Sequence, residues 1–174
     1  RPTVMVIDLD RFKQVNDSVG IAVGDSILLA LARRLGRLLK PQDTLARLAG
    51  DQFGLILLSE NESTRVVAFA ETLRKTLRAP FVLNNREIFL TASMGVALSD
   101  GQPHGNEEVL KDAELAMYHA KRLGRDNTQL YSAALTQSAR HLALAGADTT
   151  RQSNSHGTGG LRQDKRRTLP PWQW

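Results

Sequence analysis

Two short apolar segments of this chain each lead into an aspartate, and this pattern constrains the fold more than any other feature of the sequence. The first segment is Val4–Asp10 (VMVIDLD), and the second flanks the turn Ala49–Phe53 (AGDQF). Apolar, β-branched runs of this length predict buried strands, so we expect Asp8 at the end of one strand and Asp51 at the tip of a hairpin. Two converging aspartates would supply the one or two carboxylates that Mg²⁺ prefers alongside substrate phosphates and water.

Two interpretations of these acids stay open on spacing alone. If the first strand of the hairpin lies beside the first strand of the domain, Asp8 and Asp51 meet and form a metal site. Alternatively, each is a turn acid that accepts hydrogen bonds from nearby backbone amides, as most aspartates in loops do.

The rest of the sequence predicts alternating strands and helices. Apolar residues at three- and four-residue spacing predict helices, and short β-branched runs predict strands. The predicted helices are Gly24–Lys40, Ser63–Leu77, Asn106–Arg122 and Ser132–Ala145, and the predicted strands are Thr3–Asp8, Thr44–Leu48, Phe53–Leu58, Phe81–Leu83, Glu87–Leu98 and Thr128–Tyr131. This order predicts an α+β fold, with a central, mostly antiparallel sheet and helices packed on it.

Patterning and charge divide the chain of 174 residues into a domain and a tail. Residues 1–146 have the apolar periodicity of one domain, whereas residues 147–174 lack it and are expected to form a disordered, basic tail. The end of this tail, Leu169–Trp174, is either a docking peptide or sequence translated outside its natural reading frame. Of the net charge of +5, the five basic residues and one acid from Arg151 onward supply all but one unit. The predicted domain is therefore nearly neutral, and we expect no nucleic-acid binding.

Several other classes of protein do not fit this sequence. A chain without cysteine has no disulfide, thiolate metal site or cysteine nucleophile. No apolar run approaches the roughly 18–20 residues of a membrane span, and the start carries no export signal, so we expect a cytoplasmic location with no membrane segment in this fragment. An RNA-binding α+β module would need exposed aromatic residues on its sheet, and most of the five phenylalanines look buried. Because the chain starts with Arg1 and enters a strand almost at once, we expect an N-terminal truncation.

Residues that follow the first strand have the chemistry to hold a nucleotide. Phe12 anchors the loop after Asp10, while Lys13 and the backbone amides of residues 11–13 offer a cradle for phosphate. Asn16 and Asp25 carry the amide and carboxylate groups that can read a guanine edge. Asp25, at the start of a predicted helix, is equally well explained as a capping acid.

Two basic residues lie four positions apart near the end of the third predicted helix. Lys121 and Arg125 are close enough in sequence to hold phosphates together. Basic residues at a helix C-terminus also simply offset the helix dipole. Without further evidence, the dipole explanation is the simpler one.

Five segments of the chain, taken together, resemble a known family. They follow one another in the family's order and spacing, as VIDLDRFKQVND, GDSILLALARRL, DTLARLAGDQFGLIL, LTASMGVAL and MYHAKRLGRDN. From residue 3 to about residue 131 the sequence therefore resembles the GGDEF domain of diguanylate cyclases. This resemblance implies an adenylyl-cyclase-like, ferredoxin-like fold and the condensation of two GTP into cyclic di-GMP, with Mg²⁺, across an antiparallel dimer of domains.

The resemblance also implies a role for each matching residue. Asp8 and Asp51 would bind Mg²⁺ together with the backbone carbonyl of Leu9. The nucleotide-binding residues would be Phe12 and Lys13 for phosphate, Asn16 and Asp25 for guanine, Ala49 and Gly50 in the turn, and Lys121 and Arg125 for the triphosphate. The metal and the basic pair would stabilise charge on the phosphates while the 3′-hydroxyl of the partner domain's GTP attacks the α-phosphorus.

The chain departs from the family signature in the turn itself, where GGDEF is replaced by AGDQF. Ala49 replaces a glycine next to the nucleotide, adds a methyl group and is expected to restrict positive φ. Gln52 replaces a glutamate that active members need, which keeps the shape of the side chain and removes its charge. The product-inhibition motif RxxD is represented by Lys40 and Asp43, and lysine lacks the planar fork of arginine, so we expect weak feedback. Ile21, where a histidine is frequent, is expected to pack.

The resemblance leaves two functions to consider. The intact Asp8, Asp51, Lys121 and Arg125 favour a diguanylate cyclase whose activity is weak or lost. Ala49 and Gln52 favour a catalytically inactive, GTP-sensing module that regulates an adjacent EAL phosphodiesterase domain. Both functions require GTP as ligand with Mg²⁺. An active cyclase also requires a second GGDEF domain in a homodimer, and an EAL or sensor domain is expected in the full-length protein.

Overall fold

Strands and helices alternate along the described residues of this computed structural model, which are 1–99, 106–133 and 135. The elements are β1 (Thr3–Leu9), α1 (Phe12–Val19), α2 (Ile21–Gly36), β2 (Thr44–Ala49), β3 (Gln52–Leu57), α3 (Ser63–Leu77), β4 (Phe81–Leu83), β5 (Arg86–Ile88), β6 (Ala92–Leu98), α4 (Asn106–Arg122) and β7 (Thr128–Leu130). Within these residues, no helix combines the length and apolarity needed to cross a bilayer. The predicted helix Ser132–Ala145 lies almost wholly outside the described residues, as does the whole tail 147–174.

β1 lies at the centre of the main sheet, whose strand order is β2-β3-β1-β6-β7. It runs antiparallel to both neighbours, so that Asp8 lies opposite Gln52 of β3 and Ser93 of β6. The pairing of β6 with β7 is parallel, and the predicted α+β fold with a mostly antiparallel sheet is confirmed.

The predicted neighbour of β1 is wrong, because the second strand of the hairpin, β3, pairs with β1 and the first strand, β2, lies at the edge. Four of the six residues of β3 are buried, whereas five of the six residues of β2 are exposed. An apolar strand gains more by burial inside the sheet, and a strand that carries Arg47 is better suited to the edge.

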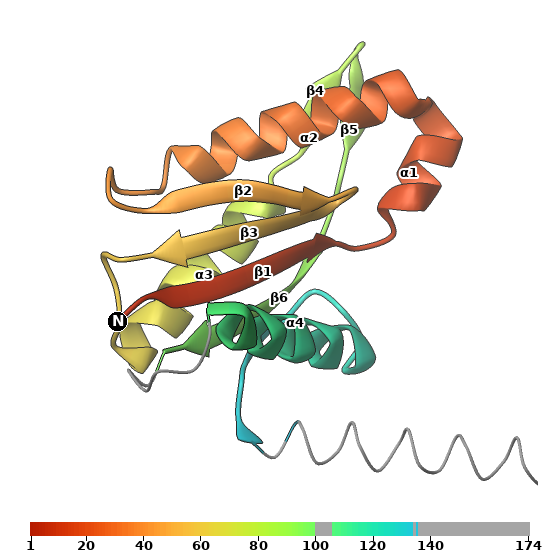
Figure 1. Cartoon of the computed structure of the whole chain (residues 1–174). Coiled ribbons are helices and arrows are strands. Elements are labelled where there is room, and N and C mark those ends of the chain that lie inside the picture. The colour runs from red at the N-terminus through yellow and green to blue at the C-terminus, as the bar shows by residue number, and fades with distance from the viewer. Residues whose placement is uncertain (100–105, 134, 136–174) are drawn as a thin grey trace, which may run out of the picture. The chain divides into compact units, whose positions relative to one another are not determined.

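Helices cover both faces of the sheet, with α3 and α4 on opposite sides of it (Figure 1). α2 and α3 pack on the face that carries Met5, Ile7 and Leu9. α4 packs on the other face, against Val4 and Val6. Because side chains alternate along a strand, Asp8 lies on the same face as α4.

α4 approaches the sheet closely at Gly95 of β6. A Cβ atom at this position would lie 2.0 Å from the carbonyl oxygen of Ala113 and 2.2 Å from the amide nitrogen of Met117. Both atoms belong to the backbone of α4 and cannot move independently. Glycine at position 95 therefore sets the distance between helix and sheet.

Three local features differ from the predicted elements. Residues 12–19 form the helix α1 where a loop is predicted. The predicted strand Glu87–Leu98 is broken, because β5 pairs with β4 in a separate two-stranded sheet and only β6 joins the main sheet. Asn84 and Asn85 both have positive φ, which favours the tight hairpin turn between β4 and β5. Ile21, which was expected to pack, is 72% exposed because it begins α2 ahead of that helix's buried face.

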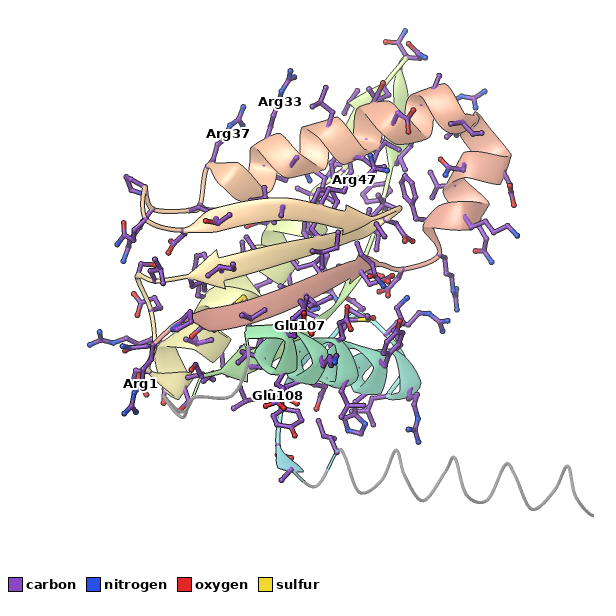
Figure 2. The ribbon with its side chains drawn as sticks, in the orientation of Figure 1. Arg1, Arg33, Arg37, Arg47, Glu107 and Glu108 are labelled. Carbon is purple, nitrogen blue, oxygen red and sulfur yellow. The ribbon has the colours of Figure 1, made fainter. Side chains whose placement is uncertain are left out.

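The arginines of α2 divide between solvent and protein. Arg33 and Arg37 are exposed and project from the helix away from the sheet (Figure 2). Arg34 instead donates hydrogen bonds to the carbonyl oxygen of Thr76, in the last turn of α3, and to those of Ala79 and Pro80, which follow the helix. Its guanidinium carbon lies 3.9 Å from the centre of the Phe81 ring. It therefore joins α2 to α3 and to β4.

Candidate active site

Asp8 is a buried carboxylate that accepts hydrogen bonds from two side chains. It is only 4% exposed. Lys121 of α4 donates from Nζ to Oδ1 at 2.6 Å, and Gln52 of β3 donates from Nε2 to Oδ2 at 2.8 Å. A buried charge needs such partners because removal from water is costly when it is unpaired. The chain itself therefore compensates the charge of Asp8.

Asp51 lies next to the end of β1, at the tip of the β2–β3 hairpin. Its carbonyl oxygen accepts a hydrogen bond from the Leu9 amide at 3.2 Å. Burial raises the pKa of the Asp51 carboxyl, and the negative charge of Asp8 raises it further, while Lys121 and Arg47 lower it in part. Because Coulomb effects of this kind require proximity, the structure brings the two acids to one region. Their expected role as metal ligands, with the Leu9 carbonyl, stays a prediction.

Six residues with predicted nucleotide or metal roles line one cavity of about 240 Å³. They are Phe12, Lys13, Asn16, Asp25, Gly50 and Asp51. Leu28 and Arg47 line the same cavity, and the sequence analysis assigned no role to either. Arg47 donates from Nε to the Gly50 carbonyl oxygen at 2.8 Å and so holds the turn (Figure 2 labels it on β2). In the sequence, the feature that could have indicated this role is a basic residue three positions before the turn glycine, Gly50.

Asn16 and Asp25, which are predicted to bind guanine, lie on α1 and α2, and these two helices come close together at Gly24. A Cβ atom at Gly24 would lie 1.7 Å from Oδ1 of Asn16, so the Asn16 amide occupies the space that a side chain there would fill. This oxygen is buried and accepts no hydrogen bond from the part of the chain that the structure describes. Asn16 and Asp25 line the same cavity, where they combine an amide with a carboxylate.

The phosphate cradle predicted around Lys13 is the start of a helix. Arg11 precedes α1 with φ 55°, and no side chain caps this N-terminus. The first amides of α1 are thus left for an anion, and the helix dipole favours negative charge there. Lys13 is exposed on the first turn and adds a positive charge to the same region.

The structure separates Arg125 from Lys121. α4 ends at Arg122, so Arg125 does not continue the helix as the four-residue spacing suggests. Arg125 lines a second cavity of about 730 Å³, together with Asp10 and Arg11, whereas Lys121 contacts Asp8. That both residues hold one triphosphate stays a prediction.

Ala49 is exposed and has no positive φ, because it continues β2 while Gly50 takes φ 43°. The expectation that alanine restricts positive φ at position 49 is therefore wrong. The replacement of the signature glycine by Ala49 therefore only adds a methyl group beside the turn.

Lys40 and Asp43 line a third cavity of about 230 Å³, where internal contacts occupy both residues. Lys40 Nζ lies 3.4 Å from Oε1 of Glu60. Asp43 accepts hydrogen bonds from the Ser59 hydroxyl at 2.8 Å and from the amides of Lys40, Leu58 and Ser59. Burial raises the pKa of the Asp43 carboxyl, but these hydrogen bonds outweigh burial and leave the pKa lowered. Weak product inhibition at this pair stays a prediction.

The residues present suit one Mg²⁺ only if a nucleotide supplies further ligands. Among residues 1–99, 106–133 and 135, no three His, Cys, Asp or Glu side chains gather into a metal-binding group. Asp8 and Asp51 are the two carboxylates predicted to bind the metal, whereas Asp25, which lines the same cavity as Asp51, is predicted to bind guanine. Two is the number of carboxylates that Mg²⁺ takes from proteins when phosphate and water complete its shell.

Fold and site together define an α+β domain in which a buried, lysine-paired aspartate lies at the end of the central strand, beside the turn of a hairpin. The family model described as "Diguanylate cyclase, GGDEF domain" matches residues 1–127. This chain belongs to the GGDEF domain family.

Two curated relatives from Pseudomonas aeruginosa illustrate the similarity. The bifunctional diguanylate cyclase/cyclic di-GMP phosphodiesterase MucR is 36% identical over 139 residues, which is 80% of this chain and 20% of MucR. The cyclic di-GMP phosphodiesterase NbdA is 36% identical over 133 residues, which is 76% of this chain and 17% of NbdA. The chain thus spans about a fifth or less of these relatives.

Solved GGDEF domains have the same fold. The GGDEF domain of TpbB (YfiN) from Pseudomonas aeruginosa aligns with a TM-score of 0.71 and 32% identity, over 75% of this chain and 82% of that one. The GGDEF domain of DgcB from Caulobacter crescentus, solved in complex with cyclic di-GMP, aligns with a TM-score of 0.68 and 28% identity, over 74% of this chain and 77% of that one.

Proposed function

We propose that this domain binds GTP with Mg²⁺ between α1, α2 and the β2–β3 hairpin, and converts it to cyclic di-GMP weakly or not at all. The observation that carries the second part is the hydrogen bond from Gln52 to Asp8 at 2.8 Å. The first part rests on the grouping of six predicted residues around one cavity.

Each part of GTP has a complementary group in this region. The Asn16 amide and the Asp25 carboxylate offer a donor and an acceptor for the edge of guanine. Lys13 and the free amides at the start of α1 offer positive potential for the phosphates. Arg125 is assigned to the triphosphate on the family resemblance, and its side chain has no ion pair among the described residues.

Gln52 weakens the site because a carboxamide takes the place of a negative charge. Its N–H group uses a lone pair of Asp8, and Lys121 uses a lone pair of the other oxygen. A bound Mg²⁺ would supply positive charge that stabilises the reacting phosphates. Asp25 also lines the cavity but is assigned to guanine. With Asp51 as the second proposed metal ligand beside Asp8, the protein offers one carboxylate fewer than the GGDEF signature does.

A second candidate function is regulation by bound GTP without turnover. Among the relatives at 36% identity, NbdA is named a cyclic di-GMP phosphodiesterase, so a similar segment occurs in a protein whose named activity is degradation. On this candidate, the present domain binds GTP and alters the activity of a phosphodiesterase domain in the full-length protein.

Calorimetric titration with GTP, in buffer containing Mg²⁺, tests the binding claim. We expect binding of GTP but not of ATP, and an increase in melting temperature with GTP concentration. Absence of both signals at millimolar GTP would remove the binding claim. Separately, chromatography of the reaction products should show more cyclic di-GMP from the Ala49→Gly/Gln52→Glu variant than from the wild type. Equal product from both would show that the altered signature does not limit turnover.

A further inference from the structure

Asp10 is a buried carboxylate to which neither the sequence nor the proposed function assigns a role. It is 6% exposed. Its Oδ1 accepts a hydrogen bond from the Ser93 hydroxyl at 2.6 Å, and its Oδ2 accepts one from the Thr91 hydroxyl at 2.7 Å. Oδ2 also accepts the backbone N–H of Asp126 at 3.0 Å. The last contact joins the end of β1 to a turn 116 residues later in the chain.

This turn follows α4 and has an unusual backbone. Gly124, Arg125 and Asp126 have φ values of 109°, 64° and 49°. Two consecutive residues with side chains in the left-handed region are energetically unfavourable, and they persist only where surrounding contacts hold them. The contacts around this turn are therefore its cause.

Asp126 is fixed through its side chain as well as through its amide. Arg74 of α3 donates to Oδ1 of Asp126 at 2.8 Å and to its carbonyl oxygen at 3.1 Å, and Arg78 forms a second ion pair with the same carboxylate. On the other side, Nδ2 of Asn127 donates to the carbonyl oxygens of Ala120 and Arg125. The backbone of Arg125 is thus held from α3, from α4 and from β1.

The side chain of Arg125 is left free by the same arrangement. Its neighbour Asp126 is engaged by two arginines, and the nearby carboxylate of Asp10 is engaged by two hydroxyls and an amide. Arg125 is exposed, lines the cavity of about 730 Å³, and has no ion pair within the described part of the chain. A fixed backbone with an unpaired guanidinium suits recognition of an anion.

We propose that Asp10 is a positioning residue, which holds the Gly124–Asp126 turn and thereby aims Arg125 at the terminal phosphates of the nucleotide. The positioning itself is independent of the ligand, whereas the identity of the ligand rests on the proposed function. Loss of the Asp10 carboxylate would release the Asp126 amide, and Arg125 would sample many directions. The affinity for triphosphate would fall without a change in the guanine contacts.

Hydrogen exchange of the ligand-free protein tests the positioning. In Asp10→Asn, one acceptor oxygen is lost and the remaining oxygen is uncharged, so the hydrogen bond from the Asp126 amide is weaker and we expect this amide to exchange about tenfold faster relative to the sheet amides. Asp17→Asn, an exposed aspartate of α1, is the matched control and should leave this amide unchanged. If Asp10→Asn does not fold, Ser93→Ala removes one donor and should show a smaller increase. An Asp126 amide as protected in both variants as in the wild type overturns the proposal.

Binding measurements test whether positioning reaches the ligand. We expect Asp10→Asn to raise the Kd for GTP with Mg²⁺ about five- to tenfold and to leave the Kd for guanosine unchanged. In an Arg125→Ala background, Asp10→Asn should have no further effect on GTP, because both changes remove the same contact. Equal losses for GTP and guanosine, or effects of the two substitutions that multiply, would overturn the proposal. If the wild type binds no GTP, the proposed function fails, and the exchange experiment still decides the positioning.

Discussion

Replacement of Gln52 by glutamate would restore the acid of the family signature, and we expect it to destabilise the domain when no metal is bound. In the wild type, Nε2 of Gln52 donates to the buried Asp8 carboxylate at 2.8 Å. The substitution removes this donor and places a second carboxylate against the first. Lys121, at 2.6 Å from the other oxygen of Asp8, compensates only one of the two charges.

The size of the effect follows from two terms. A hydrogen bond to a charged group is worth about 1.5–3 kcal/mol, and two carboxylates about 4 Å apart repel by about 4 kcal/mol at an effective dielectric constant of 20. Uptake of a proton limits the total, because protonation of a glutamate with an ordinary pKa costs about 4 kcal/mol at pH 7 and about 1 kcal/mol at pH 5. The protonated acid can then donate to Asp8 as the amide does. We therefore expect a loss of about 2–4 kcal/mol at pH 7 that shrinks to about 1 kcal/mol at pH 5.

Urea denaturation at both pH values, with chelator and with Mg²⁺, measures this effect. Gln42→Glu, at an exposed position outside the cleft, is the matched control for an added negative charge and should change stability by less than about 0.5 kcal/mol. Mg²⁺ should stabilise Gln52→Glu more than the wild type. A Gln52→Glu variant as stable as the wild type at pH 7 in chelator would refute the assignment of Gln52 as the compensating partner of Asp8.

Three further predictions concern the site and its support. Asp51→Asn should raise the stability at pH 7, because burial and the charge of Asp8 hold the pKa of this carboxyl above its ordinary value. The folded state therefore favours the protonated form, which the asparagine amide resembles. In urea denaturation the gain in stability should vanish as the pH falls below the ordinary range of aspartate. Gly24→Ala should weaken GTP binding in calorimetry at little cost in stability, since the new Cβ overlaps only with the end of the Asn16 side chain. In Gly95→Ala, by contrast, the new Cβ meets the backbone of α4, and this variant should lose about 3 kcal/mol or more of stability in the same denaturation assay.

The sequence predicts elements that depend on local periodicity and misses features that depend on distant partners. β1, the hairpin, α3 and α4 follow from runs of apolar residues that any neighbour could bury. Whether β3 or β2 pairs with β1 depends on which of the two strands buries more apolar surface there. The pattern of one strand alone does not give this answer, because it depends on both strands. The helix α1 was not predicted because its apolar residues are few, although Phe12, Val15 and Val19 have helical spacing.

The candidate site was predictable to the extent that its residues lie in recognisable segments. Six predicted residues share one cavity, since they come from three segments that the sheet brings together. Asp10 was not assigned a role because its partners, Thr91, Ser93 and Asp126, lie more than 80 residues away in sequence. The left-handed turn at Arg125 could not be predicted either, because contacts with residues distant in sequence hold it.

The edge position of β2 has a consequence for how such a domain can change over generations. Five of its six residues are exposed, and the turn that follows it contacts β1 through the hydrogen bond from the Leu9 amide to the Asp51 carbonyl oxygen. Within the signature, a substitution at the exposed Ala49 can therefore alter the turn while the interior stays as it was, whereas a substitution at Gln52 or Phe53 reaches buried residues.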